Sequence, residues 1–441
     1  MTYIKKLKPH EFSIWHGKRP LLGQLDIELT ERCNNNCVHC CINLPENDTN
    51  ARNREMDTAF VQGLLRQAAD LGCLTVRFTG GEPLLREDFQ ELYVFTRRLG
   101  MRVILFTNGR LITPELADLL ARIPPGRVVE VSVYGMHAES YEAAAGARGS
   151  FAEFRRGVER LRERGIPFMV RGAILPPNKG EWEEFKEWAA GIPSMDYLPV
   201  ESMNFALRAR RDDPAKNERI RKLRLSPEET VRMLAKYPRY LNEMHQFCGK
   251  FMRPPGDKLF SCGAGHGTCV DAYGQAQMCM GLRDPGTVYD LRRGAVCHCE
   301  RSDAIANTHE EITSSQKAHG MTRLRYALTE FFPRLREMRA TNPDYLRRCA
   351  QCFLKGLCEQ CPAKSWMEHG TLDTPVEYLC AIAHAQAGYL GLLTEKESAW
   401  EVEDGRERVK GFSGSTVQGS TVQGFSGLGG STVQGLEKHE D

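Results

Sequence analysis

The sequence predicts an α/β protein with a parallel sheet, followed by a smaller cysteine-rich domain and a disordered repeat tail. From about Leu25 to Val200, strand-like runs alternate with helix-like runs, a pattern typical of βα units. Cysteines gather in two separate sets, and short Gly/Ser repeats fill the end of the chain. We therefore expect four segments, namely a lead-in (1–23), a core with a helical bridge (24–247), a cysteine-rich domain (248–400) and a flexible tail (401–441).

The expected strands of the core are 24–29, 74–79, 102–107, 128–134, 167–174 and 195–200. The expected helices are 57–71, 86–99, 113–121, 139–163 and 181–190. Thr113 and Pro114 predict one helix start, because threonine caps a first turn and proline fits the first helical position.

Composition excludes several classes of function. The formal net charge of +2 gives no electrostatic basis for binding nucleic acid or a membrane surface. No apolar run approaches the length of a membrane span, and Met1 is not followed by a signal-peptide core, so a cytoplasmic location is expected. Sixteen cysteines in such a chain favour metal binding over disulfides.

The first cysteine set follows the first expected strand. Cys33, Cys37 and Cys40 have the spacing C-x3-C-x2-C, which lets one loop place three thiolates around an iron–sulfur cube. Three ligands leave one of four irons open to a substrate or cofactor. A structural zinc site is the alternative, with His39 or Cys41 as a fourth ligand.

The second expected strand ends in the motif Gly80-Gly81-Glu82-Pro83. In this order and spacing, the two motifs resemble those of the radical SAM superfamily. The resemblance implies a partial (β/α)6 TIM-like barrel, a [4Fe–4S] cluster on the three cysteines and S-adenosylmethionine (SAM) on the open iron. It also implies that residues 80–83 line the methionine amino group and that His39 lies near the adenine.

Barrel active sites lie at the carboxyl ends of the strands, so the other strand ends are candidates too. By the same resemblance, Ser132 and Arg171 match positions that contact the ribose and carboxylate of SAM, and Asn108 ends the third strand. Each has a plain structural alternative. Asn108-Gly109 is a common sequence for an ordinary turn. Arg171 would form a salt bridge at the barrel rim, and Ser132 would be a small residue in a crowded strand. No residue stands out as a catalytic acid or base.

The second cysteine set resembles the SPASM extension of radical SAM enzymes, which binds two auxiliary [4Fe–4S] clusters. The resemblance implies two ligand groups: Cys262, Cys269, Cys279 and Cys361 for the first cluster, and Cys349, Cys352, Cys358 and Cys380 for the second. The x2 spacing before Cys361 departs from the common x3, and an extra Cys297-His298-Cys299 interrupts the pattern. A zinc ribbon over 349–361 would leave the other four cysteines unexplained.

Clusters fully ligated by cysteine cannot bind substrate, so they would serve as electron acceptors. The first functional hypothesis is an oxidoreductase or maturase that uses the 5'-deoxyadenosyl radical to oxidise or crosslink a side chain of a peptide or protein. The second is modification of a small molecule, such as a sugar or tetrapyrrole, in cofactor or natural-product biosynthesis. An electron carrier or sensor is a third, which the Gly80–Pro83 motif disfavours. An external donor such as flavodoxin or ferredoxin would supply electrons.

The tail repeats Ser-Thr-Val-Gln-Gly at 415–419, 420–424 and 431–435. Such repeats cannot bury enough apolar surface to fold, so disorder is expected. The tail is either simple low-complexity sequence, an interaction tether or a peptide substrate of the enzyme itself.

Overall fold

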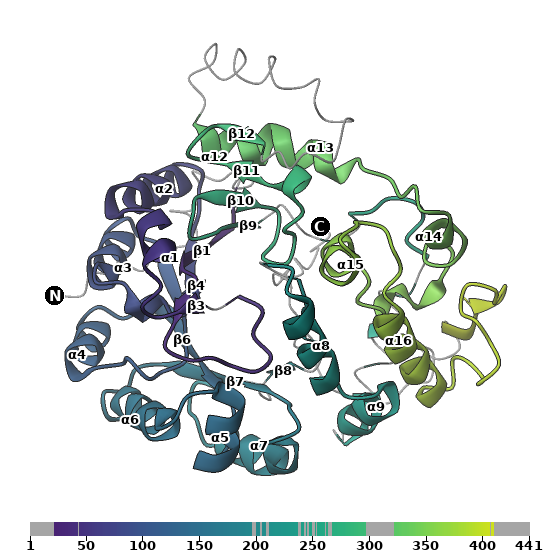
Figure 1. Ribbon diagram of the computed structural model, residues 1–441, viewed down its shortest axis with the longest axis horizontal. Helices are drawn as coiled ribbons and strands as arrows, with labels where there is room; N and C mark the ends of the chain where they lie inside the picture. Colours follow the sequence, from purple (N-terminus) through teal and green to yellow (C-terminus); the bar gives the residue numbers. More distant parts are fainter. Residues whose placement is uncertain are drawn as a thin grey trace, which may run out of the picture.

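One sheet of ten strands organises the molecule, in the order β12-β11-β10-β9-β1-β4-β5-β6-β7-β8. This computed structural model describes residues 22–409, except 43, 196–199, 203–204, 209–210, 237–239, 242–243, 245–246, 249–251, 253, 261, 263–266, 297–321 and 406. In Figure 1 the strands curve around a central space, with α2–α7 on the outside. Residues 1–21 of the lead-in and the repeats of the tail lie outside the described residues.

The core strands pair in parallel in chain order, as the βα pattern predicted. They are β1 (Gln24–Thr30), β4 (Thr75–Gly80), β5 (Arg102–Thr107), β6 (Gly126–Val133), β7 (Phe168–Ala173) and β8 (Val200–Ser202). The predicted fold class, an α/β partial barrel, is confirmed. The sixth strand begins later than the expected 195–200, and residues 196–199 of that range lie outside the described part of the chain.

The helices between these strands cover the outer face of the sheet (Figure 1). They are α1 (Thr49–Arg54), α2 (Thr58–Asp70), α3 (Phe89–Arg98), α4 (Pro114–Arg122), α5 (Ala138–Ala145), α6 (Ser150–Glu163) and α7 (Trp182–Ala190). Thr113 caps α4 as predicted, since its side chain accepts a hydrogen bond from the amide of Leu116. Their buried apolar residues form the main hydrophobic core with the strands.

The prediction of a single helix over 139–163 is wrong. Gly146 ends α5 and Gly149 precedes α6, and both are left-handed, with φ of 61° and 78°. An α-helix cannot continue through left-handed residues, so the segment divides in two. Helix-favouring residues on both sides concealed this break in the sequence.

Replacing Gly146 by alanine is expected to destabilise the protein more than the same change at Gly149. Both residues are left-handed, which costs a non-glycine residue about 1–3 kcal/mol. A Cβ at Gly146 would also lie 2.2 Å from the carbonyl oxygen of Asn36, whereas a Cβ at Gly149 meets nothing within 4 Å. Urea unfolding of the two variants measures the difference. Equal losses would show that the contact with Asn36 is unimportant.

The cysteine-rich part of the chain continues the barrel sheet. Strand β9 (Gly267–Val270) pairs in parallel with β1, and β10 (Gln275–Gln277), β11 (Tyr289–Asp290) and β12 (Ala295–Val296) add antiparallel strands beyond it. Cys269 lies opposite Asp26 of β1 in this register. A short second sheet pairs β2 (Arg32–Cys33) with β3 (Leu44–Pro45). The predicted core (24–247) and the predicted cysteine-rich domain (248–400) therefore contribute strands to the same sheet.

Of the helices of the second half, α12 and α13 lie beside β11 and β12 near α2, and the others occupy the side of the molecule opposite α1–α4 (Figure 1). They are α8 (Pro214–Leu223), α9 (Pro227–Ala235), α12 (Arg323–Tyr326), α13 (Phe332–Arg336), α14 (Pro343–Arg347), α15 (Pro362–His369) and α16 (Glu377–Tyr389). A second hydrophobic cluster includes Tyr240, Cys248, Phe353 and Ala383. Within the described residues, none of the helices has the length and apolar character needed to cross a bilayer.

Candidate active site at the carboxyl edge of the barrel

The cysteine loop leaves the end of β1 and is fixed against helix α5. The amide of Asn36 donates to the carbonyl of Ala145 at 2.9 Å, and the amide of Val38 donates to that of Ala144 at 3.1 Å. The amide of Cys40 closes a turn onto the carbonyl of Cys37 at 3.1 Å. Backbone hydrogen bonds thus hold the loop at the carboxyl edge of the sheet.

The thiols of Cys33, Cys37 and Cys40 lie within electrostatic reach of one another. Burial, together with the Glu82 carboxylate and the Cys40 thiol, raises the pKa of the Cys33 thiol to about 12. Burial also raises the pKa of Cys37, and its two cysteine neighbours add to the effect. Thiolates this close need a cation to balance them, so the donor set fits an iron–sulfur cluster.

Neither side chain considered as a fourth zinc ligand completes a closed site. Cys41 packs against two hydrophobic clusters. The His39 ring lies 5.7 Å from that of Tyr134 and 5.0 Å from that of Phe205, and burial lowers its pKa to about 4. Across the described residues, no three His, Cys, Asp or Glu side chains converge as ligands of a single metal ion.

The Gly80–Pro83 turn packs directly under the start of the cysteine loop. The amides of Gly81 and Glu82 donate to the carbonyls of Thr30 and Arg32 at 2.7 and 2.8 Å. A Cβ on Gly81 would lie 2.2 Å from the Arg32 carbonyl oxygen, and one on Gly80 would lie 2.2 Å from that of Thr30. Only glycine permits so close an approach, so this turn fixes how the loop leaves β1.

Glu82 is fully buried and joins the ends of two strands. Its carboxylate accepts hydrogen bonds from the Thr107 hydroxyl at 2.9 Å, the Asn108 amide at 2.8 Å and the Leu84 amide at 3.1 Å. The Asn108 side chain donates to Asn34 Oδ1 at 2.7 Å and lies 3.8 Å from Cys33 Sγ. The structure therefore brings Asn108 and the Gly80–Pro83 turn to the cysteine loop.

Burial of Glu82 predicts a pH-dependent stability for the cofactor-free chain. Desolvation raises its pKa from 4.5 to about 7, despite the hydrogen bonds that it accepts. The folded state then favours the protonated form, so stability is highest below pH 4.5 and falls as pH rises to about 7. The loss from this one group is at most roughly 3 kcal/mol. In urea titrations at several pH values, the free energy of unfolding of Glu82→Gln should fall less steeply with pH than that of the wild type. Identical dependence on pH in both proteins would contradict a raised pKa for Glu82.

Ser132 and Arg171 lie opposite each other on β6 and β7. Arg171 forms an ion pair with Glu130, and its guanidinium carbon lies 5.6 Å from the centre of the Phe106 ring. Val131 and Val133 belong to the hydrophobic core, so Ser132 faces the opposite, interior side of the strand. The structure places both residues inside the barrel, where Arg171 already has a carboxylate partner.

One site residue carried no signal in the sequence. Arg110 bonds the carbonyl of Asn34 and donates to Asn35 Oδ1 at 2.7 Å, and Glu153 holds its guanidinium at 2.6 Å. It thereby ties the cysteine loop to the loop after β5 and to α6. A lone arginine after Asn-Gly resembles any surface residue, and only the fold shows its position.

The comparison with protein families decides the identity of this part of the chain. Residues 27–189, which contain the cysteine loop and the Gly80–Pro83 turn, match the model of the radical SAM superfamily. This stretch is a radical SAM domain. Members of this superfamily carry a [4Fe–4S] cluster and use SAM, and the residues described above fit both groups.

Known relatives of the radical SAM domain differ in what they act on. The chain is 32% identical over 170 residues to an AdoMet-dependent heme synthase of Methanosarcina barkeri, covering 38% of this chain and 48% of that protein. It is 35% identical over 175 residues to the PqqA peptide cyclase of Xanthomonas euvesicatoria, covering 40% of this chain and 43% of that protein. The chain therefore spans about half the length of the curated relatives that it matches.

A solved structure resembles the chain over a longer range. Streptococcus suis SuiB bound to S-adenosylmethionine superposes with a TM-score of 0.57 and 15% identity, covering 86% of this chain and 84% of SuiB. This likeness extends beyond the radical SAM domain into the cysteine-rich part. It establishes similarity of fold for that part.

Beyond the radical SAM domain, the remaining cysteines form two neighbourhoods. Cys279, after β10, is half-buried beside the thiols of Cys361 and Cys262, which help to raise its pKa to about 11. Cys349, Cys352, Cys358 and Cys380 affect one another in the same way. Cys269 is buried in β9. Each thiol neighbourhood draws on segments far apart in the sequence.

The cysteines outside these groups have other surroundings. Cys73 and Cys248 are buried in the two hydrophobic cores. Burial alone raises the pKa of Cys248 to about 12. Cys297 and Cys299 lie outside the described residues.

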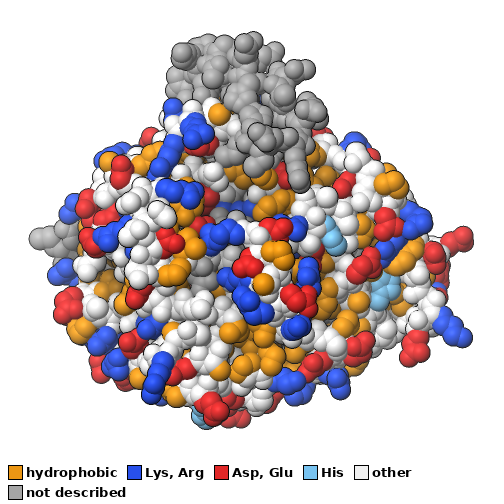
Figure 2. Space-filling model, viewed as in Figure 1, with side chains coloured by type: hydrophobic (Ala, Val, Ile, Leu, Met, Phe, Trp, Pro, Cys, Tyr) orange, Lys and Arg blue, Asp and Glu red, His pale blue; other side chains and the backbone are white. Residues whose placement is uncertain are grey.

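On the face seen in Figure 2, acidic and basic side chains are interspersed and neither sign dominates.

Proposed function

We propose that this chain is a radical SAM enzyme that removes a hydrogen atom from a peptide or protein and leaves an oxidised or crosslinked side chain. The observation that carries the proposal is the meeting of three neighbouring thiols with the Gly80–Pro83 turn at the carboxyl edge of the barrel. Cluster and SAM together would supply the 5'-deoxyadenosyl radical that abstracts the hydrogen atom.

Residues of the radical SAM domain would hold these groups in place. Cys33, Cys37 and Cys40 are the proposed cluster ligands, and residues 80–83, His39, Asn108, Ser132 and Arg171 are the proposed contacts of SAM. Asn108 already lies against Cys33, so cluster and cofactor contacts adjoin. The rings of Tyr134 and Phe205 beside His39 would help to exclude water.

The eight cysteines of the second half would hold two auxiliary [4Fe–4S] clusters. Their proposed ligands are Cys262, Cys269, Cys279 and Cys361 for one, and Cys349, Cys352, Cys358 and Cys380 for the other. Support comes from the electrostatic effect of Cys361 and Cys262 on Cys279, and from the effects among Cys349, Cys352, Cys358 and Cys380. Loss of a hydrogen atom leaves the substrate with one unpaired electron, so a closed-shell product requires an acceptor for one further electron. An external flavodoxin- or ferredoxin-type donor would supply the electron that starts the reaction.

A peptide substrate is favoured by similarity to the PqqA peptide cyclase, combined with a SuiB-like fold over most of the chain. The second candidate is a tetrapyrrole, which the similarity to AdoMet-dependent heme synthase and Fe-coproporphyrin III synthase supports. Both candidates use the same radical chemistry and differ only in the substrate that reaches the barrel mouth.

Anaerobic turnover of the full chain with SAM and a low-potential reductant tests the proposal. We expect release of 5'-deoxyadenosine and a loss of about 2 Da from the region beyond Lys410, which removal of two hydrogens produces. 5'-Deoxyadenosine with an unchanged tail would exclude the tail as substrate, and added Fe-coproporphyrin III would then test the tetrapyrrole candidate. Absence of 5'-deoxyadenosine from iron-loaded protein would refute the proposed chemistry.

A further inference from the structure

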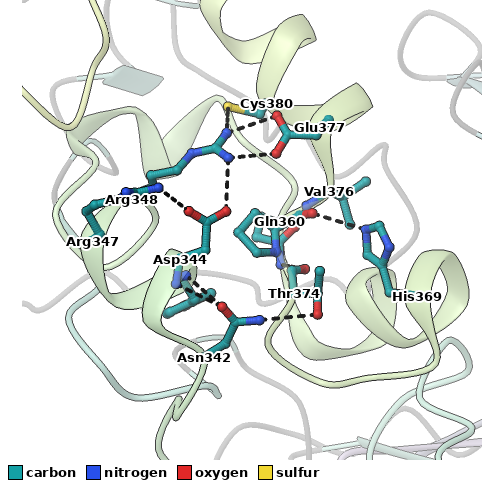
Figure 3. Close-up of polar contacts among 12 residues, drawn as sticks. Asn342, Asp344, Arg347, Arg348, Gln360, His369, Thr374, Val376, Glu377 and Cys380 are labelled. Carbon is teal, nitrogen blue, oxygen red and sulfur yellow. Dashed lines mark hydrogen bonds and ion pairs between the residues drawn. The ribbon is translucent and has the colours of Figure 1, made fainter.

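Two side-chain nitrogen atoms lie close to the sulfur of Cys380. Arg348 Nη2 donates to Cys380 Sγ at 3.8 Å, and His384 Nδ1 lies 3.6 Å from the same sulfur, one helical turn further along α16 (Figure 3 shows the arginine). Neither nitrogen belongs to a proposed ligand of the cluster. A thiolate at this position would therefore have two side-chain N–H groups near it.

Arg348 is held firmly in this position. Glu377 binds its guanidinium through two hydrogen bonds, of 2.7 and 2.9 Å, and Asp344 adds a third of 3.2 Å. The guanidinium carbon lies 4.7 Å from the centre of the Trp400 ring. The side chain is only 15% exposed, so its charge is poorly screened by water. A planar guanidinium fits this forked arrangement, which an ammonium could not reproduce.

The hydrogen bonds of His384 fix its tautomer. The amide of Ala399 donates to Nε2 at 3.2 Å, so Nε2 carries a lone pair. The ring proton of neutral His384 must then be on Nδ1, which lies 2.9 Å from the Cys380 carbonyl oxygen and faces the sulfur as well. His384 is therefore a neutral donor beside the charged donor Arg348.

Gln360 and Asn342 form further hydrogen bonds near these groups (Figure 3). Gln360, between Cys358 and Cys361, accepts from the Val376 amide at 3.0 Å and so fixes the start of α16. Asn342 caps α14 by accepting from the Asp344 amide at 2.9 Å. The start of α16 is thereby joined to the loop that carries Cys358 and Cys361, and the start of α14, which ends beside Arg348, is capped.

We propose that Arg348 and His384 set the reduction potential of the cluster held by Cys349, Cys352, Cys358 and Cys380, by donating hydrogen bonds to the sulfur of Cys380. This inference rests on the proposed function, since it requires that second auxiliary cluster. One-electron reduction adds a negative charge to the cluster and its thiolates. Hydrogen bonds donated to a cluster thiolate stabilise that charge and raise the potential. Glu377 and Asp344 offset the guanidinium charge of Arg348, so its effect comes through the N–H group that it directs at the sulfur. Neither residue is a ligand, and both act through Cys380.

Redox titration of the fully loaded protein, followed by electron paramagnetic resonance, tests this role. The signal that Cys352→Ser removes identifies the second cluster. In Arg348→Gln we expect the equilibrium constant for its one-electron reduction to fall about tenfold, which corresponds to a midpoint about 59 mV more negative. Arg348→Lys should recover part of the shift, and His384→Phe should cause a smaller shift in the same direction.

Arg347→Gln is the matched control. It removes the same charge one residue away, and Arg347 also binds Asp344, at 2.5 Å, but it is 76% exposed and faces no thiol. Its midpoint should equal that of the wild type. Equal midpoints for Arg348→Gln and Arg347→Gln, at full iron content, would overturn the inference and leave the proposed function intact. If Arg348→Gln loses the cluster, His384→Phe provides the test, and an unchanged midpoint potential in that variant would overturn the inference. A wild-type chain with only about four irons would remove the auxiliary clusters and the inference together.

Discussion

Replacing Cys37 by serine is expected to abolish SAM cleavage. The loaded wild-type chain should contain about 12 irons, and the variant about eight, because three thiolates are the fewest that can hold the first cluster. The Cys37 side chain is buried, so no external thiol can replace it. Release of 5'-deoxyadenosine should fall at least about 100-fold, since changes even outside the ligand shell of a metal cost up to that factor.

Cys41→Ser is the matched control for this change. Cys41 follows the loop directly and packs against two hydrophobic clusters. We expect it to retain about 12 irons and its cleavage of SAM. If Cys41→Ser instead lost iron as Cys37→Ser does, the ligand set of the first cluster would have to be revised.

Replacing Cys352 by serine is expected to separate the two halves of the reaction. The iron content should again fall to about eight per chain, but from the second auxiliary cluster. The first cluster lies on another part of the fold, so 5'-deoxyadenosine should still form. Product should fall at least about 100-fold, because the substrate radical would lose its electron acceptor. Iron analysis, 5'-deoxyadenosine release and product mass measured on one sample distinguish these effects.

Cys248→Ala serves as the control for Cys352→Ser. Both side chains belong to the second hydrophobic cluster, but burial alone accounts for the raised pKa of Cys248, with no contribution from a neighbouring thiol. The variant should lose stability and keep all its iron. Unchanged iron and product in Cys352→Ser would refute the second auxiliary cluster.

The sequence by itself determined the radical SAM domain and its sheet. Strand and helix periods are local properties, and five of the six core strands lie within two residues of their predicted bounds. The spacing of Cys33, Cys37 and Cys40 and the Gly80–Pro83 turn are also local, because each needs only a few neighbouring residues to define its chemistry. The auxiliary ligands and the SAM contacts stay predictions.

Tertiary structure decided what depends on contacts between distant segments. Left-handed Gly146 interrupts a periodic helical stretch because the cysteine loop packs against it, and β9 extends the sheet because its edge meets β1. Arg110 and Arg348 are ordinary arginines in the sequence, and each is 32 or more residues from a group that gives it a role. Hydrogen bonds and charges act through space, so residues remote along the chain acquire a function only when the fold brings them together.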